Sequence, residues 1–129
     1  MRVLLPALFI LMPVLAFAQV KRSNPPTLST PTGYTHIVEV TGPNRTIYIS
    51  GQIAFDKDGK IVGAAGATFA DVVKMNSYIT DMSKAQAVRD VRAQYFKDAT
   101  PASTFVEVKG LVRPELLLEI EVIAAIPAR

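Results

Sequence analysis

Apolar and polar residues alternate through the segment Leu116–Ala124. One phase of the alternation holds Leu116, Leu118, Ile120, Val122 and Ala124, and the other holds Leu117, Glu119, Glu121 and Ile123. Because successive side chains of a strand point to opposite faces, the pattern predicts a strand with Glu119 and Glu121 on one face. That face is either an ordinary solvated acidic surface, the commoner case for carboxylates, or part of a functional site.

Similar patterns predict further strands along the chain. Segments 35–40 and 46–55 flank the turn signal Gly42-Pro43-Asn44, so we expect them to pair as a hairpin. A buried strand is expected at 72–80, and the region 100–125 is expected to supply two strands.

One helix is predicted between the buried strand and Pro101. The sequence Ser83-Lys84-Ala85-Gln86 has the form of a capping box that opens the helix. Val88, Val91 and Tyr95 then follow at the spacing of one apolar stripe, which we expect to face the sheet.

The N-terminal residues 1–18 have the pattern of a secretory signal peptide. Arg2 precedes an apolar run over residues 3–15, and Ala16-Phe17-Ala18 matches the cleavage pattern. The alternative, a membrane-spanning helix, is disfavoured because the run is short and contains Pro6 and Pro13. We therefore expect an exported protein, periplasmic or secreted, that does not remain in the membrane after cleavage. Residues 19–32, with three prolines, read as an extended leader or linker, and residues 33–129 as one domain.

Composition narrows the classes of function. The chain of 129 residues has no cysteine, which excludes a disulfide framework and a thiolate nucleophile. Its 14 basic and 11 acidic residues are scattered, so nothing indicates a nucleic-acid-binding surface. A single histidine, His36, and acids without metal-ligand spacing predict neither a zinc site nor any other metal site, and no cofactor is expected.

Four blocks together resemble the RidA family of reactive-intermediate deaminases, also called the YjgF family. The blocks are Y-T-H at Tyr34, I-Y-I-S-G-Q-I-A at Ile47, D-V-V-K-M-N-S-Y-I-T-D-M at Asp71 and T-P-A-S-T-F-V-E-V-K-G-L at Thr100. The resemblance runs from about Gly33 to Ile126, with the blocks in the family's order. It implies an α/β (α+β) subunit of chorismate-mutase-like type, with helices on one face of a mixed sheet. It also implies a homotrimer with clefts for a small metabolite between subunits.

The resemblance also implies roles for individual residues, and one of them is missing. In active members, an arginine that begins R-[ST]-x-V-E-V clamps the substrate carboxylate, and a strand glutamate helps water attack an imine. Ser103 stands at the arginine position, while Glu119 stands at the glutamate position. A serine hydroxyl cannot replace the planar two-pronged guanidinium, so we expect the standard activity to be lost. Arg89 or Arg92 of the predicted helix could substitute, but arginines on a helix are more commonly solvated.

Three other residues have weaker signals. The resemblance places Tyr34 near the ligand cleft, where its phenol would bind a ligand or a water, and it is as readily a half-buried tyrosine at a strand end. Gln52 belongs to the strongest block and is expected at the subunit interface or ligand site. His36 is more commonly a packed or rim residue than a base in this position.

A helix that the resemblance implies is absent from the sequence. Only eight residues separate Gly63 from Val72, whereas a helical crossover between parallel strands requires roughly a dozen or more. We therefore expect the first long helix to be lacking and an apolar face of the sheet to be left open. This is either a genuine deletion, compensated by rearrangement or association, or an error in the sequence.

These observations predict a RidA-like protein that binds a small molecule without the standard activity. Two alternatives stay open. One is an active enamine or imine deaminase that uses Glu119 and a water molecule; in that case the enzyme would resemble a 2-iminobutanoate/2-iminopropanoate deaminase. The other is a trimeric scaffold without catalysis, in which Glu119 and Glu121 make interface hydrogen bonds.

Overall fold

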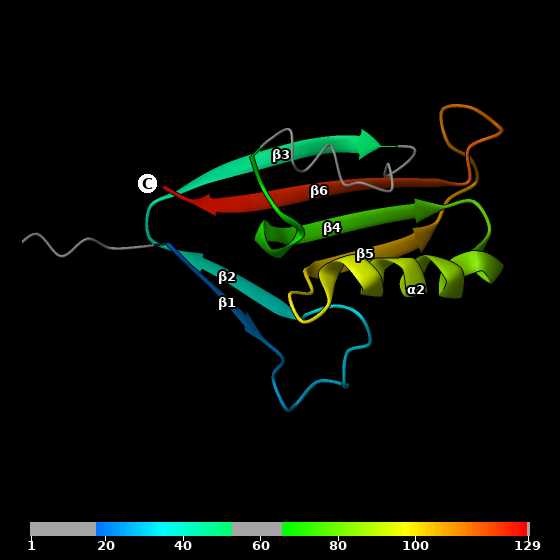
Figure 1. The fold of residues 1–129 in the computed structure, drawn as a ribbon. Coiled ribbons are helices and arrows are strands. Elements are labelled where there is room, and N and C mark those ends of the chain that lie inside the picture. Colours follow the sequence, from blue (N-terminus) through cyan, green and yellow to red (C-terminus); the bar gives the residue numbers. More distant parts are fainter. Residues whose placement is uncertain (1–17, 53–65, 129) are drawn as a thin grey trace, which may run out of the picture.

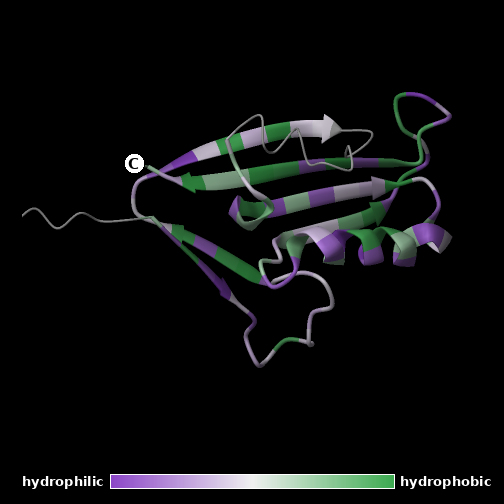
Figure 2. Cartoon of the chain, viewed as in Figure 1, coloured by the Kyte–Doolittle hydropathy of each residue, from purple (hydrophilic) through white to green (hydrophobic). Residues whose placement is uncertain are grey.

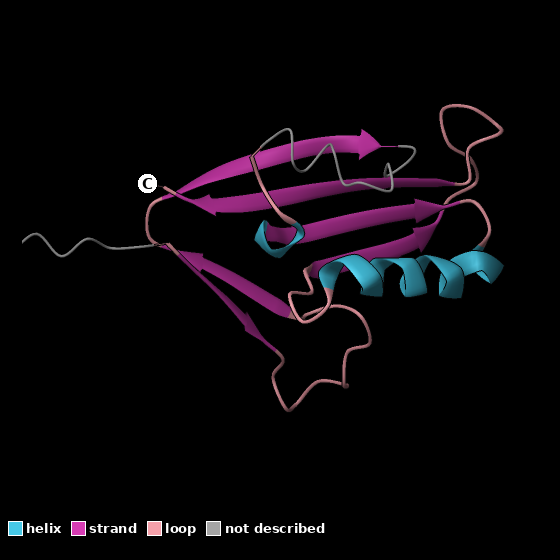
Figure 3. Ribbon diagram, in the orientation of Figure 1, coloured by secondary structure: helices cyan, strands magenta, loops and turns pink. Residues whose placement is uncertain are grey.

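Two sheets and one α-helix make up the part of the chain that the computed structural model describes, residues 18–52 and 66–128. The elements follow in the order β1 (Gln19–Ser23), β2 (Ile37–Thr41), β3 (Asn44–Gln52), η1 (Phe69–Asp71), β4 (Val72–Ile79), η2 (Met82–Lys84), α2 (Ala85–Phe96), β5 (Ala102–Glu107) and β6 (Leu118–Pro127) (Figure 1). The expected α+β class, with a helix on one face of a mixed sheet, is confirmed (Figure 3). In the described ranges no helix has the length and apolar character that crossing a bilayer requires.

The larger sheet has the strand order β3-β6-β4-β5. β6 is antiparallel to both of its neighbours, β3 and β4, and the remaining pair, β4 and β5, is parallel. A parallel pair requires a crossover connection, which α2 supplies here. The predicted strands at 72–80 and at 116–124 are therefore β4 and β6, side by side in the interior of the sheet.

The expected hairpin between segments 35–40 and 46–55 is wrong. β2 pairs instead with β1, so part of the segment expected to be a leader is a strand, and β3 pairs with β6. The reason is burial: Ile47 and Ile49 of β3 pack against Ala124 and its apolar neighbours, which β2 could not offer. β1 and β2 form a separate ribbon at the end of the sheet where β3 begins (Figure 1).

The two faces of the larger sheet differ in chemistry. The α2 face carries a core cluster of Val72, Met75, Phe96, Ile120 and Val122, all at most 5% exposed. Apolar and polar residues alternate along the strands (Figure 2). As a result the opposite face carries the polar side chains. Glu119 lies opposite Tyr78 and Glu121 opposite Asn76 in the pairing of β6 with β4, and the prediction that the two glutamates share a face is confirmed.

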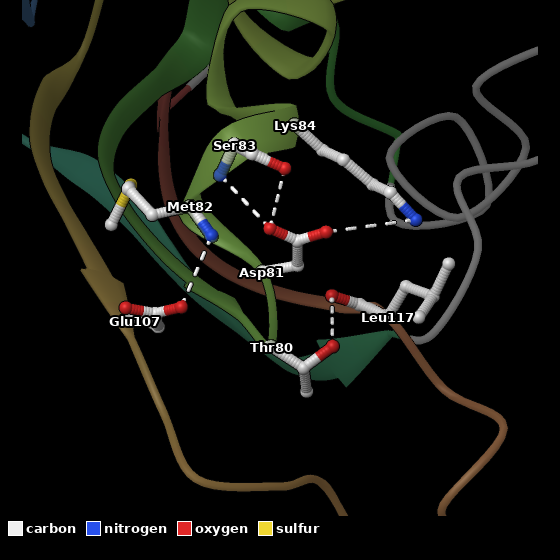
Figure 4. A network of polar contacts seen from close by, with 7 residues as sticks. All are labelled: Thr80, Asp81, Met82, Ser83, Lys84, Glu107 and Leu117. Carbon is white, nitrogen blue, oxygen red and sulfur yellow. Dashed lines mark hydrogen bonds and ion pairs between the residues drawn. The ribbon is translucent and has the colours of Figure 1, made fainter.

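Helix α2 begins through a cap that differs from the predicted box. The Asp81 carboxylate accepts hydrogen bonds from the Ser83 amide at 3.0 Å and the Ser83 hydroxyl at 2.6 Å, and η2 leads from this cap into α2 (Figure 4). These hydrogen bonds hold the pKa of Asp81 below its usual value. Glu107 of β5 accepts from the Met82 amide, which ties the same turn to the sheet (Figure 4).

The apolar stripe of α2 borders an open groove. Val88 and Tyr95 are half-buried, whereas Val91 is 52% exposed. The groove has a volume of about 400 Å³ and runs between α2 and side chains of β4 and β6, among them Met75, Ile79, Leu118 and Ile120. The short connection in which the first long helix was expected to be lacking comprises residues 64–71. Residues 66–71 are described and contain only the 3-10 turn η1 before β4, whereas residues 64 and 65 lie outside the described residues.

Candidate functional site

A cavity of about 500 Å³ lies where the segment before β2 meets α2 and β5. It is lined by hydroxyl, phenol, amide and guanidinium groups together with one aromatic ring, from Thr30, Thr32, Gly33, Tyr34, Gln86, Arg89, Arg92, Ser103 and Phe105. Four residues singled out from the sequence thus line the same cavity: Tyr34, Arg89, Arg92 and Ser103. A hollow of this size with a few converging polar groups is typical of a small-molecule site.

Backbone geometry and hydrogen bonds hold Tyr34 at the cavity. Gly33 has a φ of 71°, a left-handed conformation that suits glycine, and it turns the chain just before Tyr34. Thr35, which is 3% exposed, anchors the next position: its hydroxyl donates to the Thr100 carbonyl at 2.9 Å and its amide to the Pro101 carbonyl at 3.0 Å. Arg22 of β1 donates to the same Thr100 carbonyl at 3.2 Å. The first sheet therefore fixes one wall of the cavity against the start of β5.

His36 serves this wall as a packed rim residue. Its ring meets the Tyr34 ring edge-on, with centroids 5.2 Å apart, and its Nε2 lies 2.8 Å from the Ser29 carbonyl oxygen. No group of three or more histidine and carboxylate side chains suited to a metal occurs within the described ranges.

The opposite wall comes from α2 and β5. Ser103 and Phe105 point toward the helix, while Thr104 between them points to the other face and accepts a hydrogen bond from Lys74. Arg92 Nη2 donates to Ser103 Oγ at 3.0 Å, and the Arg89 guanidinium carbon lies 5.5 Å from the centre of the Phe105 ring. Arg92 is thus not simply a solvated helix residue. The sequence named Arg92 only as one of two helix arginines that could substitute for the missing arginine, and it favoured a solvated side chain.

Glu119 and Glu121 lie on the other face of the sheet. Glu121 accepts hydrogen bonds from Asn76 Nδ2 at 2.6 Å and from the Tyr78 hydroxyl at 3.0 Å. The hydrogen bond to Glu121 raises the pKa of Tyr78, since it favours the protonated phenol, and burial and the charges of both glutamates add to the shift. A smaller cavity of about 230 Å³ on this face is lined partly by Glu121, Asn76 and Lys74.

Glu119 itself lies against β3 at a glycine. A Cβ at Gly51 would collide with the Glu119 carboxylate, so the missing side chain leaves room for that carboxylate. Gln52, the next residue, lies opposite Ile120 in the β3–β6 pairing. Within one chain, therefore, Glu119 does not line the cavity that contains Tyr34, Arg89 and Ser103.

Comparison with known proteins agrees with this architecture. The family model described as endoribonuclease L-PSP matches residues 59–126, more than half of the chain. The chain belongs to the RidA (YjgF) family. A solved Rid-family protein of unknown function from Yersinia pestis is 29% identical to this RidA-family chain, with a TM-score of 0.68 over 84% of this chain and 98% of its own.

Two further solved structures support the same assignment. A YjgF-family protein from Mycobacterium tuberculosis is 35% identical over 73% of this RidA-family chain and 87% of its own, with a TM-score of 0.53. The TdcF protein of E. coli, solved with bound serine, is 26% identical over 65% of this chain and 88% of its own, with a TM-score of 0.51.

Proposed function

We propose that this RidA-family protein binds a small metabolite in the cavity between residues 30–34, α2 and β5. The observation that carries the proposal is the convergence of Tyr34, Arg89 and Ser103 on one hollow of about 500 Å³. The E. coli relative that was solved with bound serine supports a small polar metabolite as the ligand. The guanidinium, hydroxyl and amide groups of the lining can all donate hydrogen bonds, and no carboxylate is among them. Such a lining suits a polar ligand with several oxygen acceptors.

We further propose that the chain lacks the standard hydrolytic deaminase activity. A general base must lie within hydrogen-bond reach of the water that it activates, directly or through one other water. Glu119 projects from the face of the sheet opposite to Ser103 and Phe105, so a single subunit does not bring this carboxylate to the cavity.

One observation favours the alternative of an active enamine or imine deaminase. Arg92 reaches Ser103, the position at which the resemblance implies a clamping arginine, and so puts a guanidinium near it. Activity would then require a neighbouring subunit of a homotrimer to supply Glu119. A mass measurement by light scattering, combined with an activity assay, separates the two functions.

The binding proposal is tested by thermal shift with a panel of small metabolites that includes serine. At a free concentration one hundredfold above its Kd, a specific ligand increases the free energy of unfolding by about 2.7 kcal/mol, and this raises the melting temperature. Tyr34→Phe, which removes one hydroxyl from the cavity, should weaken that ligand by roughly twofold to tenfold. Tyr48→Phe, at a tyrosine 77% exposed and outside the cavity, is the matched control and should bind as the wild type does.

A folded protein that no metabolite stabilises, or a ligand that responds equally to the two tyrosine variants, would contradict binding at this cavity. The activity is assayed with an enzyme that generates 2-aminoacrylate. We expect pyruvate and ammonia to appear at the uncatalysed rate. A much faster release that Glu119→Ala abolishes would establish the deaminase alternative.

A further inference from the structure

The open groove beside α2 is separate from the proposed binding cavity. The groove lies between the helix and β6, whereas the cavity lies between the helix and β5, and only Arg92 lines both. Residues from Lys84 to Phe96 border the groove, so it follows the whole of α2, whose 12 residues span about 18 Å. The groove is therefore an elongated hollow with two distinct ends.

The width of the groove decides which kind of molecule fits it. A volume of about 400 Å³ spread along about 18 Å gives a mean cross-section of roughly 20 Å². A helix with its side chains is about 10–12 Å across, so its cross-section is several times larger. Carbon atoms in contact lie about 3.5–4.0 Å apart, which gives one extended hydrocarbon chain a cross-section of about the required size. The groove suits a single chain and not a partner helix.

The lining of the groove is mainly apolar. Phe69, Tyr95 and Phe96 close the end at which α2 stops, with the Phe69 ring centroid 4.9 Å from that of Tyr95 and 5.4 Å from that of Phe96. Met75 and Ile79 form part of the floor and are buried. A hydrocarbon chain in this position would remove its own apolar surface and that of the groove from water, which is the main source of favourable free energy.

Positive charge marks the other end, at which α2 begins. Lys84 lines the groove there, and its ammonium group contacts Asp81 only loosely, at 3.9 Å, with both side chains about half exposed. Ser83 engages the Asp81 carboxylate more tightly, at 2.6 Å and 3.0 Å. The first turn of α2 has no acidic residue, so the positive end of the helix dipole adds to the charge of Lys84. No carboxylate is among the described residues that line the groove, so this end suits a negatively charged group.

We propose that the groove is a second ligand site, which binds a medium-chain fatty acid with its carboxylate at Lys84 and its methyl end at Phe69. An extended chain advances roughly 1.2 Å per bond, so about ten to twelve carbons reach most of the way along the groove. This site goes beyond the proposed function, because its place in the fold, its lining and the class of its ligand all differ from those of the metabolite cavity.

Isothermal titration below the micellar concentration tests the proposal with three probes: octanoate, decanoate, and decyltrimethylammonium, which has a ten-carbon chain and a positive head. Each buried methylene strengthens binding about threefold to fourfold, so decanoate should bind roughly tenfold more tightly than octanoate. Decyltrimethylammonium should bind roughly threefold to tenfold more weakly than decanoate, because it loses an attraction and meets a like charge.

Two variants and a matched control locate the site. Lys84→Gln should reduce the difference in affinity between the two ten-carbon probes, whereas Lys109→Gln, at an exposed lysine outside the groove, should leave it unchanged. Val91→Glu puts a charge among apolar side chains and should weaken decanoate by roughly tenfold or more. Val91 is 52% exposed, so this substitution is compatible with folding.

A measurement on the wild-type protein keeps the test independent of variants that fail to fold. The methyl resonance of Met75, assigned by its loss in Met75→Leu, should shift and saturate on titration with decanoate and stay in place with acetate. Equal affinity for octanoate and decanoate, equal affinity for the two heads, or a Met75 signal that decanoate does not move would each overturn the proposal. Competition between serine and decanoate would also overturn it, since the two sites are separate, and failure of serine alone to bind would count only against the metabolite cavity.

Discussion

The open groove beside α2 leads to a direct prediction about two side chains that line it. Met75 lies at the floor of the groove and is 1% exposed, whereas Val91 lies on the helix at its mouth and is 52% exposed. Replacing each by alanine removes apolar carbon from the same groove. If the groove is open to water, the two substitutions should have very different effects on the free energy of unfolding.

The magnitudes follow from burial. Met75→Ala creates a cavity in the core cluster, so we expect a loss of about 2–5 kcal/mol. Val91→Ala removes two carbons worth about 0.8 kcal/mol each when fully buried, and a side chain that is half exposed yields about half of that total. The higher helix propensity of alanine returns about 0.5 kcal/mol. The net loss for Val91→Ala should therefore be only about 0.3 kcal/mol.

Urea denaturation of the wild type and both variants measures these free energies, provided that the free energy of unfolding depends equally on urea concentration in all three proteins. A loss of about 2 kcal/mol or more for Val91→Ala would refute the reasoning, because it would mean that Val91 is covered in solution. Repeating the melts over a range of protein concentration then identifies the cover. A loss that grows with concentration indicates a second copy, and a constant loss indicates another part of the same chain.

Two further predictions concern carboxylates. The hydrogen bonds from Ser83 hold the pKa of Asp81 below 3.8, so the stabilisation that they give is present above that pH and is lost as the pH falls through the lowered value. The difference in melting temperature between wild type and Asp81→Asn should therefore be constant near neutrality and shrink below about pH 3.8. A difference that persists in acid would contradict this. Glu121→Gln removes the charge that faces the Tyr78 phenol, so the pKa of Tyr78 should fall toward 10.0 in a site-resolved NMR titration. An unchanged pKa would mean that Glu121 does not control the titration of Tyr78.

The alternation of apolar and polar residues along the sequence correctly predicted individual strands and the helix. β4, β6 and the stripe of α2 came from repeats of two and 3.6 residues, and each is present in the structure. Strand pairing was harder, because the turn at Gly42 suggested a hairpin. The partner of β3 is set instead by apolar contacts with β6, more than seventy residues away. The helix was predicted to open with a capping box at Ser83, but the Asp81 carboxylate caps the turn instead, because it accepts the hydrogen bond from the Ser83 amide.

The candidate site was predicted in part. Tyr34 and Ser103 were placed by resemblance, and the cavity brings them together. The contact between Arg92 and Ser103 depends on how α2 lies across β5, which no pattern within either segment specifies. That Glu119 lies on the face of the sheet opposite to the cavity likewise depends on the face against which α2 packs.

The place of β6 in the sheet has a consequence for synthesis on the ribosome. β3 and β4 are both translated before β6, and each hydrogen-bonds to it along its length. Until the 10 residues of β6 emerge, the nascent chain exposes two strand edges that have no partner. The larger sheet therefore cannot close before β6 has emerged, and a ribosome-associated chaperone that shields those edges until then should raise the yield of folded protein.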